Sequence, residues 1–122
     1  MRMQELEYVR NSLRQLIGRS LSSVEFVRDY VQLRFDGPTM TVLTPIEVSV
    51  GGRVVKATDQ GFKDALCGRI SRDVVDTMVE PEACLELRFE DQTVIRVSID
   101  PADYVVPEAV LFGAGDVVWW VC

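Results

Sequence analysis

Apolar residues near the N-terminus recur every three or four positions, at Met3, Leu6, Val9, Leu13, Leu16 and Ile17. This spacing places them along one side of an α-helix and leaves the charged residues between them on the other faces. Gly18 follows directly, at the position where a helix often ends in a left-handed glycine. The pattern therefore predicts an amphipathic N-terminal helix that packs one side against a core.

From residue 22 onward the apolar period changes to two. Val31, Leu33 and Phe35 alternate with polar residues, and Leu87 and Phe89 do so in the second half. Such alternation is typical of antiparallel sheet with one buried face and one face in water. The predicted strands, separated mostly by turn residues, cover 22–28, 30–35, 39–44, 46–50, 53–57, 72–79, 84–89, 93–99, 108–112 and 117–121.

The chain also contains an internal repeat. The segment Leu-Ile-Gly-Arg at 16–19 recurs as Leu-Cys-Gly-Arg at 66–69, and Leu-Arg-Phe at 33–35 recurs at 87–89. We interpret residues 4–57 and 59–99 as two copies of one α-β-β-β unit, followed by a C-terminal hairpin over 108–121. The second helix is expected to be short, with Thr58 or Asp59 as its N-cap and Gly68 just after its end.

These elements predict one α+β domain spanning residues 1–122, since a chain of 122 residues is the size of a single domain. Most of it is antiparallel β. The two α-β-β-β repeats are expected to form a barrel-like or half-open sheet with the N-terminal helix packed on it. A closed or half-closed barrel hides sheet edges, which otherwise invite aggregation.

Charge is distributed unevenly along the chain. The net charge is −6, and residues 62–122 hold five basic and twelve acidic side chains. Nucleic acids and anionic membranes repel such a surface, because phosphate binding needs a basic stripe. No apolar run approaches the ~18 residues of a membrane span, and the N-terminus lacks the apolar stretch of a signal peptide. We therefore expect a cytoplasmic protein that binds neither nucleic acid nor membrane.

The sequence offers little catalytic chemistry. It has no histidine, the commonest general base and metal ligand. Its three cysteines, Cys67, Cys84 and Cys122, form no metal-binding spacing, and the first two are expected to be buried, reduced thiols. Asp100 before Pro101 is expected to cap a short helical turn. We therefore predict no catalytic, cofactor-binding or metal-binding residue, no cofactor and no enzyme activity.

Two features favour protein binding instead. Trp119 and Trp120 are adjacent on a predicted strand, so regular alternation places them on opposite faces, and tryptophan is enriched in interface hot spots. Glu86, Glu90 and Asp91 belong to the only dense acidic group. We take these five residues as candidate partner-binding positions for a basic protein, and leave a homodimer open.

Several motifs resemble a family of small bacterial proteins of unknown function. They are the duplicated Leu-x-Gly-Arg, the echoing runs at 29–37 and 85–91, Pro-Glu-Ala at 107–109 and Trp-Trp-Val at 119–121. The family has no assigned catalytic residues, so the resemblance implies none here. In size, acidity and β-rich pattern its members are similar to the immunity proteins of bacterial toxin systems.

The sequence thus favours a non-catalytic protein-binding module, immunity-like or regulatory, with an acidic surface. The alternative is a small-ligand-binding β-barrel, which would show a deep apolar pocket with a few convergent polar groups. An enzyme is the third hypothesis, because so few candidate bases are present.

Overall fold

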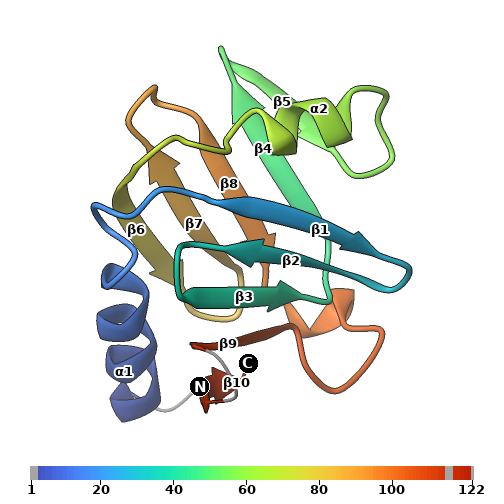
Figure 1. The fold of residues 1–122 in the computed structure, drawn as a ribbon. Helices are drawn as coiled ribbons and strands as arrows, with labels where there is room; N and C mark the ends of the chain where they lie inside the picture. The colour runs from blue at the N-terminus through green and yellow to red at the C-terminus, as the bar shows by residue number, and fades with distance from the viewer. Residues whose placement is uncertain (1–2, 115–116, 122) are drawn as a thin grey trace.

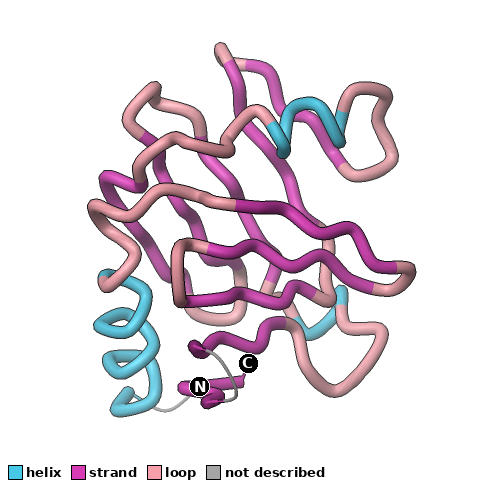
Figure 2. The backbone as a smooth tube through the Cα atoms, in the orientation of Figure 1, coloured by secondary structure: helices cyan, strands magenta, loops and turns pink. Residues whose placement is uncertain are grey.

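The computed structural model describes residues 3–114 with their side chains and the backbone of residues 117–121. Within this part, α1 (Met3–Arg14), α2 (Phe62–Cys67) and the 3-10 turn η1 (Pro101–Asp103) are the helical elements. Figure 2 shows them around a predominantly β structure. The strands are β1 (Ser23–Val27), β2 (Tyr30–Arg34), β3 (Pro38–Val42), β4 (Ile46–Val50), β5 (Arg53–Lys56), β6 (Val74–Glu80), β7 (Cys84–Phe89), β8 (Val94–Ser98), β9 (Val110–Ala114) and β10 (Val117–Val121).

The strands form two five-stranded antiparallel sheets, ordered β1-β2-β3-β9-β10 and β5-β4-β8-β7-β6. In Figure 1 the strands of the first sheet run across those of the second, with the core between them. The antiparallel α+β class is therefore confirmed. The described strands pair into these two sheets and not into one closed barrel, so the barrel-like version of the prediction is not confirmed.

Each sheet is completed by a hairpin from the other half of the chain. Strands β1 to β3 are extended by β9–β10, and strands β6 to β8 are extended by β4–β5. Each half therefore supplies a helix, three strands and a hairpin in the same order. The sequence analysis placed the C-terminal hairpin outside the two repeats. In the structure, β9–β10 is the counterpart in the second half of β4–β5 in the first half.

The segments that follow the two helices lie side by side. The amide of Gly18 donates to the Val74 carbonyl at 2.8 Å, and the amide of Val74 donates to the Arg19 carbonyl at 2.9 Å. Gly18 has φ +87°, the left-handed conformation that glycine adopts without steric cost, so the chain turns there as the sequence predicts. This junction joins the first Leu-x-Gly-Arg segment to the residues that follow the second one.

The core fills the space between the sheets. Its largest fully buried side chains include Phe35, Phe89 and Phe112, each at most 1% exposed. Helix α1 buries Val9 and Leu13, as its apolar spacing predicts, and packs beside β6. Met3 and Ile17, which the same spacing placed on the buried side, are exposed, and the helix ends at Arg14 before reaching Ile17. Burial of apolar side chains, at roughly 25 cal/mol per Å², is the main favourable contribution to such a fold.

Helix α2 differs from its prediction at both ends. Its N-cap is Gly61 rather than Thr58 or Asp59. The Asp59 carboxylate instead accepts from the Lys56 amide at 2.8 Å, which closes the turn after β5. Gly68 has φ −64°, so it is not a left-handed cap. A Cβ at Gly68 would lie 3.1 Å from the Asp64 carbonyl oxygen, and close approach of the backbone explains the glycine.

Candidate functional site: a carboxylate-lined pocket

The outer face of the β5-β4-β8-β7-β6 sheet carries a row of alternating charges. In the register, Lys56 lies opposite Glu47, Glu47 opposite Arg96, and Arg96 opposite Glu86. Arg96 forms an ion pair with Glu86 at 2.7 Å and a longer one with Glu47 at 3.6 Å. Opposite charges facing each other across strands support this register. The row also fixes where the Arg96 guanidinium lies.

A pocket of about 270 Å³ lies at one end of this row, where β4 begins, β8 ends and η1 follows. Pro45 and Ala83 form apolar parts of its wall. Its polar wall consists of Glu47, Cys84, Arg96, Ser98, Asp100 and Asp103. We call this hollow the carboxylate pocket.

Local hydrogen bonds hold two of its carboxylates. Asp100 is the N-cap of η1 and accepts from the Ala102 amide at 2.9 Å, with Pro101 in the first turn, which confirms the predicted cap. Asp103 accepts from the Ser98 hydroxyl at 2.5 Å. Both side chains are therefore oriented before any ligand arrives, which lowers the entropic cost of binding.

Negative charge predominates in the pocket. Three carboxylates, from Glu47, Asp100 and Asp103, share it with one cation, Arg96. The side-chain hydrogen bond to Glu86 raises the pKa of Arg96 above its ordinary value, despite the opposing effect of burial. Because Glu86 already engages Arg96, the pocket as a whole favours a positively charged group.

The Cys84 thiol lies in the same wall, and its pKa reflects the charges around it. Burial raises its pKa, the negative charges of Glu86 and Glu80 raise it further, and Arg96 only partly opposes them. The thiol is therefore protonated at neutral pH, and the thiol is a much weaker nucleophile than the thiolate. The expected burial is only partly correct, because Cys84 is half-buried and Cys67 on α2 is exposed.

The three acidic residues that the sequence analysis named as candidates have different surroundings in the structure. Glu86 lies beside the carboxylate pocket and forms an ion pair with Arg96. Glu90 is exposed in the turn between β7 and β8. Asp91, in the same turn, binds Arg69 at 2.7 Å and Arg72 at 3.7 Å. The three side chains do not form one acidic patch.

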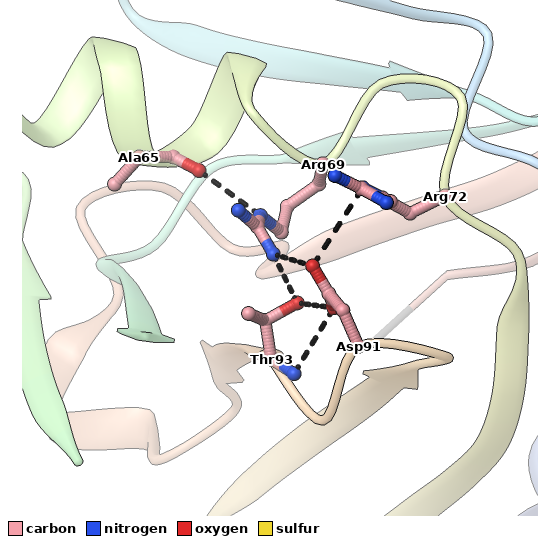
Figure 3. Close-up of polar contacts among 5 residues, drawn as sticks. All are labelled: Ala65, Arg69, Arg72, Asp91 and Thr93. Atoms are coloured by element: carbon pink, nitrogen blue, oxygen red, sulfur yellow. Dashed lines mark hydrogen bonds and ion pairs between the residues drawn. The ribbon is translucent and has the colours of Figure 1, made fainter. Parts of the chain in front are cut away.

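Asp91 belongs to a polar network that anchors the end of α2 (Figure 3). Arg69 donates to the Ala65 carbonyl at 3.3 Å, to the Asp91 carboxylate and to the Thr93 hydroxyl. The Thr93 hydroxyl in turn donates to Asp91 at 2.5 Å. The Arg69 side chain is only 10% exposed, so the network satisfies a nearly buried charge. These contacts indicate a structural role for Asp91.

Acid should weaken this network. Burial alone raises the pKa of Asp91, but the hydrogen bonds from Thr93 and the charge of Arg69 outweigh it, so the pKa lies below its ordinary value. The carboxylate therefore stabilises the fold above about pH 4, and this contribution is lost as the pH falls through the lowered pKa. We expect the stability difference between wild type and Asp91→Asn, measured by urea unfolding, to shrink below about pH 4. A difference that stays constant into strong acid would contradict this assignment.

The tryptophan candidates lie in β10, but their side chains are outside the part of the chain that the structure describes. The backbone register pairs Trp120 with Phe112, and it shifts between Val118 and Trp120. The backbone pairing of this strand with β9 is therefore irregular between Val118 and Trp120, and the prediction for the two side chains lies outside the described residues.

Among the described residues, no cluster of three or more Asp, Glu or Cys side chains is suited to hold a metal ion. No helix in that part of the chain has the length and apolar character needed to cross a bilayer.

Comparisons with protein-family models, with curated proteins and with solved structures find no match for this chain.

Sequence reasoning did not identify the carboxylate pocket. Glu47, Cys84 and Asp103 come from distant parts of the chain and meet only through the pairing of β4 with β8 and of β8 with β7. One signal was present, since Glu47, Glu86 and Arg96 all fall on the polar side of alternating strands. Without the strand order, that signal does not say which of them are neighbours.

Proposed function

We propose that this protein is a non-catalytic binding module, immunity-like or regulatory, that receives a basic side chain of a partner protein in the carboxylate pocket. The observation that carries the proposal is the excess of oriented carboxylates over cations in one wall. A lysine or arginine entering there would find acceptors at Glu47, Asp100 and Asp103, and charge-assisted hydrogen bonds are about twice as strong as neutral ones.

The pocket supports binding better than catalysis. Its thiol, Cys84, is kept protonated, and the adjacent cation Arg96 cannot act as a base. Its hydroxyl, Ser98, donates to Asp103 and has no histidine to activate it, since the sequence contains none. Its volume of about 270 Å³ also lies below the roughly 300–1,000 Å³ that encloses a whole drug-sized ligand. A single side chain presented by a larger partner suits this size.

The test compares two variants with the same change in net charge. One neutralises the pocket by Glu47→Gln, Asp100→Asn and Asp103→Asn. Asparagine retains the cap at Asp100. The control neutralises three exposed carboxylates elsewhere, by Glu25→Gln, Asp29→Asn and Asp64→Asn. Partners are captured from a lysate of the source cells, and their binding kinetics are then measured.

We expect wild type and control to capture a protein of basic pI, and the pocket variant to bind it about tenfold more weakly or worse. Association should slow with added salt, because screening shortens the range of attraction to about 8 Å at physiological ionic strength. If both variants lost the same amount of affinity for the partner, net charge and not the pocket would account for binding. Turnover of a small substrate by the wild-type protein would contradict the proposal.

A further inference from the structure

A second hollow, of about 170 Å³, lies between α1 and the edge strand β6. It is lined by Arg10, Arg14, Thr77, Met78 and Val79 and has no residue in common with the carboxylate pocket. Its two charged residues are both arginines. In a chain with more acidic than basic residues, this is a local reversal of charge. We call it the arginine groove.

Hydrogen bonds fix one of the two guanidinium groups against the strand edge. Arg10 donates to the Val79 carbonyl at 3.1 Å. The neighbouring edge amide, that of Thr77, donates to the Asp76 carboxylate at 2.9 Å. These side-chain contacts occupy edge groups that would otherwise be open to another strand. Arg10 uses one nitrogen in this contact, so its other donors remain for a ligand.

Neither Arg10 nor Arg14 forms an ion pair with any described carboxylate. Elsewhere in the described part, Arg34, Arg69 and Arg96 lie 2.9 Å or less from a carboxylate oxygen. Like charges four residues apart on a helix repel each other. Among the described residues, the groove thus holds two cations without a carboxylate partner, and an anion would relieve their repulsion.

We propose that the arginine groove binds a phosphate monoester group. Two guanidinium groups carry a charge of +2, which a phosphate monoester of about −2 balances and a single carboxylate does not. Guanidinium groups bind phosphate oxygens in a bidentate geometry, and the Thr77 hydroxyl adds a further donor. The small volume suits the phosphate group itself more than a large attached body. Free phosphorylated metabolites and phosphorylated peptide side chains both present this group.

The test is isothermal titration calorimetry of the protein, residues 1–122, with three probes. Inorganic phosphate tests the group alone, glycerol phosphate represents a metabolite, and a phosphoserine peptide represents a protein side chain. Acetate is the carboxylate control. The diagnostic variant is Arg14→Gln, which keeps good helix propensity and removes no contact found in the described structure. The matched variant is Arg53→Gln, an exposed arginine on β5 with the same change in charge.

We expect saturable phosphate binding in wild type and Arg53→Gln, and binding at least about tenfold weaker in Arg14→Gln, since the charge-assisted hydrogen bonds that Arg14 would donate to the phosphate are lost. Thermal unfolding without ligand shows that each variant is folded. Stronger binding of glycerol phosphate or of the peptide than of inorganic phosphate identifies the natural source. Absence of saturable phosphate binding, equal affinity in both variants, or equal affinity for acetate would overturn the proposal.

Discussion

Replacing Phe35 or Phe89 by alanine is expected to lower the free energy of unfolding by about 3–5 kcal/mol in each case. Both rings are 0% exposed and lie at equivalent places in the two Leu-Arg-Phe segments. Truncation removes apolar contacts and leaves a cavity that the surrounding sheets fill only in part. Such a loss is a large share of the roughly 5–15 kcal/mol that stabilises a typical domain. Urea unfolding followed by tryptophan fluorescence measures it.

The control for this experiment is Val105→Ala. Val105 is 88% exposed, so its truncation should change stability by no more than about 0.5 kcal/mol. A cost below about 1 kcal/mol for either phenylalanine variant would mean that its ring is not part of a shared core. A large effect at one phenylalanine and not at the other would contradict the equivalence of the two halves.

Replacing Arg69 by methionine should cost about 2–4 kcal/mol, because Asp91 loses its closest cation and the Thr93 hydroxyl loses a donor in a partly buried setting. Part of the Asp91 side chain is exposed to water, which keeps the cost below that of a fully buried pair. Arg19 is the matched control, since it occupies the same position in the first repeat. It donates to the Gln15 and Asp36 carbonyls at 3.2 and 3.3 Å, and it is exposed and has no carboxylate partner in the described structure.

We therefore expect Arg19→Met to cost less than about 1 kcal/mol. Chemical unfolding of both variants under the same conditions measures the difference. Equal costs would mean that the arginines act mainly by closing the helix end through the carbonyl four residues earlier, and that the Asp91 network adds little. The comparison isolates the network because each arginine donates through Nε to the carbonyl four residues earlier, Gln15 for Arg19 and Ala65 for Arg69.

Sequence periodicity predicted the secondary structure closely, because each element is encoded locally. The alternation around Leu33 and Leu87 identifies strands, and the spacing of Val9 and Leu13 identifies the helix. The predictions were wrong where one sequence pattern is compatible with more than one backbone conformation. At Gly68 the sequence gives only a glycine after a helix, and the structure uses its lack of a side chain rather than a left-handed backbone.

The candidate site was much less predictable. Asp91 and Glu86 look alike in the sequence, as exposed acids on or near one strand. Their roles depend on which arginine approaches each of them, Arg69 from the end of α2 or Arg96 from β8. These ion pairs depend on tertiary packing and strand order, which the periodicity of the sequence does not encode.

The exchange of hairpins between the halves has a consequence for synthesis of the chain. Strand β3 pairs on one side with β2, but on its other side it pairs with β9, which is synthesised much later. On the ribosome β3 therefore stays an open edge until residues 110–114 have emerged, and β4 stays open until β8 has emerged. Open edges invite pairing with other nascent chains. Chaperone binding during translation should accordingly centre on the first half of this protein.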